Sequence, residues 1–122
     1  MTGTVLVVED EPLVREAVQD ILNADGFETI CVASGRQAVE VYQAQRGAIG
    51  LVIMDIRLPG LDGAAVFAEL RRLNPTVKVI ISSAHGEKEV SERIGEKTTA
   101  TILVKPFDAD KLLTTVNKVL AN

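Results

Sequence analysis

The sequence predicts an α/β fold in which helices cover both faces of a doubly wound, five-stranded parallel sheet, giving an α-β three-layer sandwich. Two observations support this prediction. Strand-length apolar runs alternate with helix-length segments whose apolar residues recur every three or four positions, and the alternation occurs five times. The runs are also continuous, as in residues 51–54, which suits strands buried on both faces. Repeated strand–helix units of this kind place parallel strands side by side, with helices on both faces of the sheet.

The length and composition fit one domain. The chain has 122 residues, of which 47% are hydrophobic and 25% charged, so a single domain over residues 1–122 can bury a core. A net charge of −4 without a Lys- or Arg-rich run argues against nucleic-acid binding.

No apolar run is long enough for a membrane span, and we expect a cytoplasmic protein. Cys31 lies in an apolar stretch and is expected to be an inert core thiol.

The first half of the chain contains two strand–helix units. Residues 5–8 predict a buried strand, and Pro12 suits the first turn of the following helix, which Gly26 ends. Residues 28–32 predict a short, more polar strand at an edge of the sheet. Ser34 is the expected N-cap of the second helix. The inward positions are Val14, Val18, Ile21 and Leu22 in the first helix and Ala38, Val41 and Tyr42 in the second.

The third unit begins with a strand from about residue 50 to Asp55. Asp62 is the expected cap of its helix, which Asn74-Pro75 ends. The fourth strand is predicted over residues 77–81. The inward residues of the third helix are Val66, Phe67, Leu70 and Leu73.

The last two helices differ in how apolar they are. Residues 87–94 predict a fourth helix, but only Val90 and Ile94 give it an apolar face. A fifth strand follows over residues 101–104, and Asp108 caps the last helix. The inward residues of that helix are Leu112, Val116, Val119 and Leu120.

Polar side chains follow four of the five predicted strands. Glu9 and Asp10 follow the first, Asp55 ends the third, Ser83 follows the fourth and Lys105 follows the fifth. The carboxyl ends of parallel strands meet at one edge of the sheet, where such folds bind their ligands. We therefore expect these side chains to gather at one site. Any one of them alone would more often be a helix cap or a surface charge.

The chemistry of this set indicates a metal ion and a phosphoryl group. Three carboxylates, from Glu9, Asp10 and Asp55, repel one another unless a cation lies between them, and Mg²⁺ prefers oxygen ligands. An Asp carboxylate can attack phosphorus and form an aspartyl phosphate. Lys105 and Mg²⁺ would then balance the phosphoryl oxygens, and Ser83 would donate a hydrogen bond to one of them.

These residues resemble the receiver domains of two-component response regulators, and the resemblance spans the whole chain. The motifs that carry it are Glu9-Asp10, Asp55 with Leu58-Pro59-Gly60 and Asp62-Gly63 after it, Ser83-Ala84, and Lys105-Pro106-Phe107. The resemblance implies the flavodoxin-like strand order 2-1-3-4-5. It also implies a signalling domain rather than an enzyme, because its only chemistry is the phosphorylation and dephosphorylation of its own aspartate.

The resemblance implies a role for each site residue. Asp55 would accept a phosphoryl group from a phosphohistidine of a sensor histidine kinase or a histidine phosphotransfer domain. Glu9 and Asp10 would hold Mg²⁺ directly or through water, together with Asp55 and the backbone carbonyl of Arg57. Receivers usually have a cis peptide before the proline that follows the lysine, here Lys105.

Three features depart from the family pattern. Glu9 stands where many receivers have aspartate, and Ile102 stands where the family often has an aromatic switch residue. The fourth helix is weakly apolar, and Gly95-Glu96-Lys97 follow it where receivers often have a more hydrophobic segment. Two further positions, Arg57 and His85, tune phosphate lifetime in receivers, although we interpret His85 first as a surface loop residue. Without an aromatic switch, the loop after Ser83 and the fourth helix are the expected movable elements.

Two other functions remain as alternatives. A metal-dependent phosphatase or nuclease also uses acids at strand ends. Haloacid-dehalogenase-like phosphatases and Toprim nucleases resemble this layout, but each needs two acids separated by one residue. Asp55-Ile56-Arg57 lacks the second acid, and Glu9 and Asp10 are adjacent. A receiver-like binding module that is never phosphorylated would not need the full set of Asp55, Lys105 and the acid pair. The sequence leaves open whether the domain stands alone or belongs to a longer regulator, and it resembles hybrid histidine kinase receivers more than DNA-binding regulators.

Overall fold

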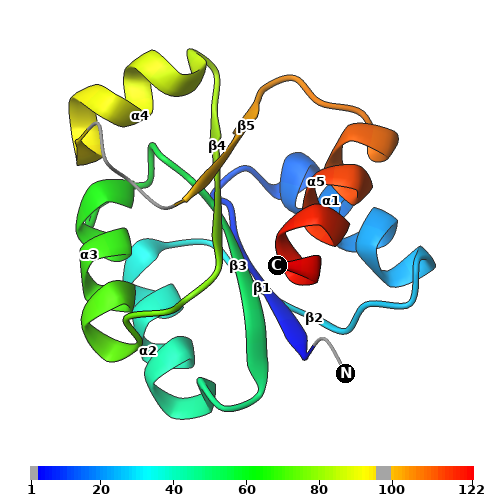
Figure 1. The fold of residues 1–122 in the computed structure, drawn as a ribbon, viewed down its shortest axis with the longest axis horizontal. Helices are drawn as coiled ribbons and strands as arrows, with labels where there is room; N and C mark the ends of the chain where they lie inside the picture. Colours follow the sequence, from blue (N-terminus) through cyan, green and yellow to red (C-terminus); the bar gives the residue numbers. More distant parts are fainter. Residues whose placement is uncertain (1–2, 96–99) are drawn as a thin grey trace.

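The computed structural model describes residues 3–95 and 100–122. Within them, five parallel strands form one sheet in the order β2-β1-β3-β4-β5, which confirms the predicted fold and strand order (Figure 1). The strands are β1 (Thr4–Val8), β2 (Thr29–Val32), β3 (Ile49–Asp55), β4 (Val79–Ser83) and β5 (Thr101–Val104). The helices are α1 (Pro12–Ala24), α2 (Gly35–Gln45), α3 (Gly63–Leu73), α4 (Gly86–Ile94) and α5 (Ala109–Ala121).

Helices cover both faces of the sheet, α1 and α5 on one side and α2, α3 and α4 on the other (Figure 1). Side chains of a strand point alternately to the two faces, so Leu6 and Val8 of β1 join the core under α2 and α3, while Val5 and Val7 join the core under α1 and α5. All four are buried. This double coverage explains why the strand sequences are continuously apolar rather than alternating.

The three predicted N-caps are confirmed. The side-chain oxygens of Ser34, Asp62 and Asp108 each accept a hydrogen bond from the backbone N–H three residues later, at 3.2, 3.0 and 2.8 Å. Each cap satisfies a donor that the first turn of a helix cannot satisfy itself. These caps fix where α2, α3 and α5 begin. For α3, this also sets the length of the loop that follows Asp55.

The predicted bounds of the fourth strand were wrong by two residues. Val77 and Lys78 lie before the strand. Val77 closes a turn, in which its N–H donates to the Asn74 carbonyl at 3.0 Å and Thr76 N–H donates to Asn74 Oδ1 at 3.1 Å. Pairing with β3 begins at Val79, and β4 continues through Ser83. Ser83 is therefore fully buried at the end of the strand rather than in the loop after it.

Cys31 lies on β2, the edge strand, and packs beside the core under α1 and α5. It is only half-buried, although the sequence suggested a core position. Partial burial is the main influence on its thiol and raises its pKa above the usual value. A higher pKa leaves less reactive thiolate, in keeping with the inert thiol that the sequence predicts.

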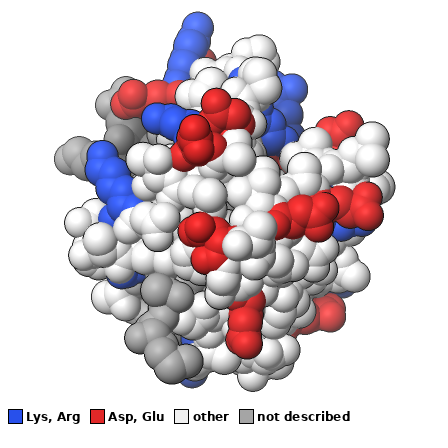
Figure 2. Space-filling view, turned by 90° about the vertical axis from the view of Figure 1, so that its right-hand side faces the viewer, with Lys and Arg blue, Asp and Glu red and all other residues white. Residues whose placement is uncertain are grey.

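The surface carries charges of both signs. On the side of the molecule where α1 and α5 lie, acidic groups are dispersed and separated by uncharged surface (Figure 2). Among the described residues, no helix has the length and apolar character needed to cross a membrane.

Candidate functional site

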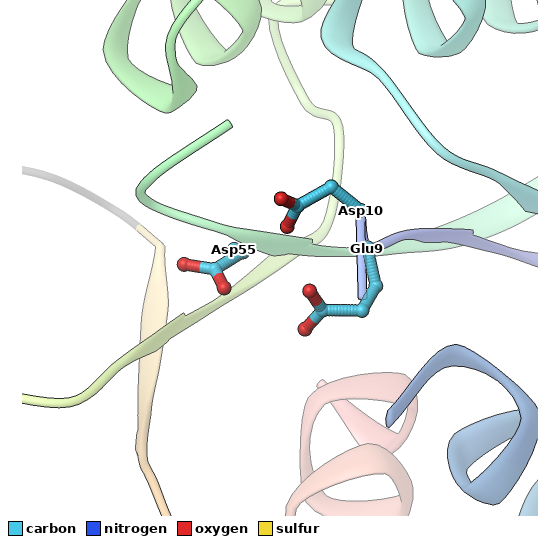
Figure 3. A group of neighbouring side chains, drawn as sticks. All are labelled: Glu9, Asp10 and Asp55. Atoms are coloured by element: carbon cyan, nitrogen blue, oxygen red, sulfur yellow. The ribbon is translucent and has the colours of Figure 1, made fainter. Parts of the chain in front are cut away.

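The acidic residues after β1 and at the end of β3 lie together because the two strands are neighbours. Val8, just before Glu9, pairs with Met54, just before Asp55. Glu9, Asp10 and Asp55 each offer a carboxylate oxygen within 4.8 Å of the others (Figure 3). Glu9 is buried, Asp55 is half-buried and Asp10 is exposed, so the cluster opens to solvent on the side of Asp10. The structure thus brings together the three acids that the sequence assigned to one site.

The loop after Asp55 is held close to the start of α3. Gly63 N–H donates to the Ile56 carbonyl at 3.1 Å, and a Cβ on Gly63 would lie only 2.5 Å from that oxygen. Only glycine permits this approach of two backbones. The Asp55 carboxylate is also fixed locally, because its Oδ1 accepts the backbone N–H of Arg57 at 2.9 Å.

Lys105 reaches the acid cluster from β5 and forms two ion pairs. Its Nζ lies 2.9 Å from Glu9 Oε1 and 2.5 Å from Asp55 Oδ2. The backbone N–H of Lys105 donates to the Ser83 carbonyl at 2.9 Å, which ties the end of β5 to the end of β4. The peptide bond to Pro106 is cis, as the resemblance implied. Lys105 therefore lies at the predicted edge of the sheet, and its ammonium group contacts the carboxylates of Glu9 and Asp55.

Two opposing influences set the pKa values of Glu9 and Lys105: burial disfavours their charged forms, and hydrogen bonds and ion pairs with neighbours favour them. For Glu9, burial is the largest influence and raises the pKa above its usual value, against the hydrogen bonds from Lys105 and from the Glu11 N–H. For Lys105, burial disfavours the ammonium form, but Asp55 and Glu9 together outweigh it and raise the pKa. One ammonium group among three carboxylates leaves excess negative charge. The donor set therefore fits a small divalent cation with oxygen ligands.

Ser83 lies at the same edge of the sheet, and its hydroxyl is bonded to Glu89 and His85. Its Oγ donates to Glu89 Oε1 at 2.5 Å and accepts the backbone N–H of His85 at 3.2 Å. Sequence reasoning missed Glu89 because it read α4 by its apolar face alone. Glu89 immediately precedes the buried Val90 and is itself buried. The narrow apolar face of α4 was the one feature of the sequence that could have indicated a buried polar residue on this helix.

Glu89 also binds the side chain of Arg57, whose Nε donates to Glu89 Oε2. Arg93 Nε lies 3.7 Å from the same oxygen. Burial opposes the ionised form of Glu89, but the hydrogen bonds from Ser83 and Arg57 outweigh burial and lower the pKa of its carboxyl group. The Glu89 carboxylate is thus ionised at neutral pH and joins α4 to the ends of β3 and β4.

The positions where this chain departs from the family pattern lie around the same edge. Ile102 is half-buried and packs against the core under α2, α3 and α4. His85 is exposed and precedes α4 without a side-chain capping bond, as expected for a surface loop residue. Of the weak segment at residues 95–97, Gly95 follows α4 with a φ of 116°, and residues 96 and 97 lie outside the described part of the chain.

Mg²⁺ should stabilise the folded protein through the acid cluster. At about tenfold above its dissociation constant, a ligand specific for the folded state adds about 1.4 kcal/mol to the free energy of unfolding. Asp10→Asn should lose most of this gain, because it removes a carboxylate from the cluster, whereas Glu11→Gln changes an exposed acid outside it. Urea denaturation with EDTA and with Mg²⁺ measures the difference. Equal Mg²⁺ responses in the two variants would exclude Asp10 from the metal site.

Comparison with known proteins shows which family the chain is similar to. The family model of the response regulator receiver domain matches residues 5–117. The chemotaxis protein CheY of Bacillus subtilis is 34% identical over 121 residues, covering 98% of this chain and 99% of that protein. The sensor kinase CckA of Brucella abortus is 33% identical over 119 residues, covering 98% of this chain but only 13% of that protein.

A solved structure shares the fold over the whole length. It is the receiver domain of the sensor histidine kinase PA1611 of Pseudomonas aeruginosa, with magnesium coordinated in its active-site cleft. The TM-score is 0.89 and the identity is 27%, and the alignment covers 100% of both chains. Together with the family match and the strand order, this shows that the chain belongs to the response regulator receiver domains of two-component signalling.

Proposed function

We propose that this receiver, acting as one unit over residues 1–122, takes a phosphoryl group onto Asp55 from a phosphohistidine of a sensor histidine kinase or a histidine phosphotransfer domain. The observation that carries the proposal is the placement of Asp55: its carboxylate lies at the end of β3, half-buried, 2.5 Å from the Lys105 ammonium group and within 4.8 Å of two more acids. A carboxylate oxygen of Asp55 forms the new O–P bond as the N–P bond of the phosphohistidine breaks. The histidine ring, protonated on its other nitrogen, takes the electron pair of the broken bond and leaves as neutral imidazole.

The acids fit a bound Mg²⁺, which Glu9, Asp10, Asp55 and the backbone carbonyl of Arg57 would hold. It would supply the positive charge that three carboxylates and a phosphoryl group need at close quarters. Lys105 already lies within hydrogen-bond distance of Asp55, so its ammonium group is placed to bind an oxygen of a phosphoryl group there. The chemistry takes place on the protein's own side chain, so the domain acts as a signalling module rather than as an enzyme with an external substrate.

The hydrolase alternative finds less support in this geometry. The haloacid-dehalogenase-like and Toprim hydrolases need a second acid two residues from the first, and the residue two positions after Asp55 is Arg57, whose side chain contacts Glu89. No observation on the described residues favours an external substrate over phosphorylation of Asp55.

Intact-mass measurement tests the proposed function. Incubation with acetyl phosphate and Mg²⁺ should add one phosphoryl group per chain, stable in acid and labile in base, as expected of an acyl phosphate. EDTA should suppress the gain, because the acid cluster then lacks its cation. No mass gain with Mg²⁺ at any concentration of acetyl phosphate would overturn the proposal and favour the binding module that is never phosphorylated.

A protein that donates a phosphoryl group to Asp55 should contact a larger area of the receiver surface than the small molecule acetyl phosphate does. Beside Lys105, α1 and the segment after β5 form an apolar depression of about 350 Å³, and Leu13 at its edge is 78% exposed. Large exposed apolar side chains next to a reactive group suit a protein partner. We therefore propose that the histidine donor docks here. Leu13→Arg should slow phosphotransfer from a histidine kinase by about tenfold or more, with acetyl phosphate labelling unchanged.

The matched control is Leu61→Arg, which changes an exposed leucine in the depression between α2 and α3 on the other side of the sheet. It should leave both reactions near wild type. A Leu13→Arg variant that accepts phosphate from the kinase at the wild-type rate would place the docking surface elsewhere.

A further inference from the structure

Glu89 is a buried carboxylate to which the proposed phosphorylation assigns no role. Its side chain is 6% exposed, yet it lies on the helix that has the fewest apolar residues facing the sheet. Among the residues that the structure describes, three contact its carboxylate through their side chains: Ser83, Arg57 and Arg93. We refer to Glu89 and these three residues as the Glu89 network. A charge buried to this extent needs such partners, because it has lost most of its hydration.

One member of the Glu89 network, Ser83, is a donor that a phosphoryl group on Asp55 would use. Ser83 ends β4, and its neighbour Ser82 pairs with Asp55 across the sheet. Arg57 follows Asp55 by two residues, but its backbone N–H contacts the Asp55 carboxylate, whereas its guanidinium group contacts Glu89. Carboxylates and phosphoryl groups accept hydrogen bonds from the same kinds of donor. The hydroxyl of Ser83 has one proton, so it cannot be donated to Glu89 and to a phosphoryl oxygen at the same time.

We propose that Glu89 is a positioning residue that opposes activation: in the unphosphorylated protein it engages the Ser83 hydroxyl and competes for that hydroxyl with a phosphoryl group on Asp55. This inference rests on the proposed function of Asp55. The competition is internal to the domain, since α4 supplies the carboxylate. Activation then requires Ser83 to exchange one anionic partner for another.

The competition also couples Asp55 to the position of α4. Within the described part of the chain, Glu89 joins α4 to Ser83 of β4 and to Arg57 after β3, whereas Val90 and Ile94 are its large apolar contacts with the core. When Ser83 turns to the phosphoryl group, the buried carboxylate loses a partner, and α4 loses one of its attachments to the sheet. A helix with so few apolar contacts is expected to move or open readily once an attachment is lost.

Beryllofluoride with Mg²⁺, which mimics the phosphoryl group, provides the test. Glu89→Gln removes the charge but keeps the size of the side chain, so the cost of releasing Ser83 falls. The apparent affinity for beryllofluoride should rise by about fivefold or more. Amide exchange over residues 84–94 of the free variant should move toward that of beryllofluoride-bound wild type. Glu92→Gln, an exposed acid on the same helix, should match wild type in both measurements.

A structural role alone would not make the effect of Glu89→Gln depend on Ser83. In a Ser83→Ala background there is no hydroxyl to compete for, so Glu89→Gln should give a much smaller gain in affinity. Should Glu89→Gln fold poorly, Glu89→Asp provides a second variant. It keeps the charge but is one methylene shorter, so its contact with Ser83 should weaken and the affinity should rise by less.

The outcomes separate the two proposals. If wild type binds beryllofluoride but Glu89→Gln binds it no more tightly, or gains equally with and without the Ser83 hydroxyl, then Glu89 only anchors α4 and the inference is wrong. If wild type neither binds beryllofluoride nor gains a phosphoryl group from acetyl phosphate, the proposed function fails, and the inference fails with it.

Discussion

Asp55→Asn should abolish phosphorylation by acetyl phosphate while leaving the fold intact. The amide is a poor nucleophile toward phosphorus, and loss of a nucleophile reduces such reactions by far more than about a hundredfold. Asn has the same shape and can still accept the Arg57 N–H that Asp55 accepts at 2.9 Å. The stability of the variant should stay near that of wild type, because repulsion with Glu9 is relieved while the ion pair with Lys105 is lost. Intact mass and urea denaturation measure the two effects.

The control for Asp55→Asn is Asp20→Asn, which changes an exposed aspartate on α1. It should gain a phosphoryl group as wild type does. Retention of the full mass gain in Asp55→Asn would mean that another side chain accepts the phosphoryl group, and the assignment of Asp55 would be wrong.

Lys105→Met should destabilise the metal-free protein more than any other change at this site. The ammonium group is the cation that pairs with Glu9 and Asp55, and the Lys105 side chain is only 22% exposed. Removing one partner of a buried ion pair costs about 3–5 kcal/mol, and partial exposure reduces the expected loss to about 1–3 kcal/mol. Added Mg²⁺ should recover part of that loss, because it supplies positive charge to the same carboxylates.

Urea denaturation of Lys105→Met in EDTA and in Mg²⁺ checks this expectation. Lys111→Met, an exposed lysine on α5, is the matched control and should change stability by less than about 0.5 kcal/mol. An equal loss in EDTA and in Mg²⁺ would show that Lys105 stabilises the fold by packing rather than by charge.

The fold could be predicted because its signals are local and agree with one another. Continuous apolar runs indicated buried strands, and the side chains of Ser34, Asp62 and Asp108 marked three helix starts that the structure confirms. The start of β4 was predicted wrongly because Val77 is apolar, yet a hydrogen bond from its N–H to the Asn74 carbonyl holds it in a turn. Apolar character alone does not distinguish a turn residue that packs on the core from the first residue of a strand.

The residues of the candidate site could be predicted, but one of their contacts could not. The ends of parallel strands meet at one edge of the sheet, so the sequence alone predicts that Glu9, Asp55 and Lys105 lie together, as they do in the structure. The direction of the Ser83 hydroxyl depends on Glu89, which α4 brings into contact through tertiary packing. Sequence periodicity treats a charged residue as exposed, so it gave no reason to bring Glu89 inward.

Chemical trapping of the modified residue tests the phosphorylation of Asp55 most directly. Borohydride reduces an aspartyl phosphate to homoserine, which changes the residue mass and survives digestion. Wild-type protein treated with acetyl phosphate and Mg²⁺, then with borohydride, should yield homoserine at position 55 in peptide mass spectra, and protein treated without acetyl phosphate should retain aspartate there. Homoserine at another acidic residue, or a phosphoryl group that borohydride does not convert at position 55, would contradict the role proposed for Asp55.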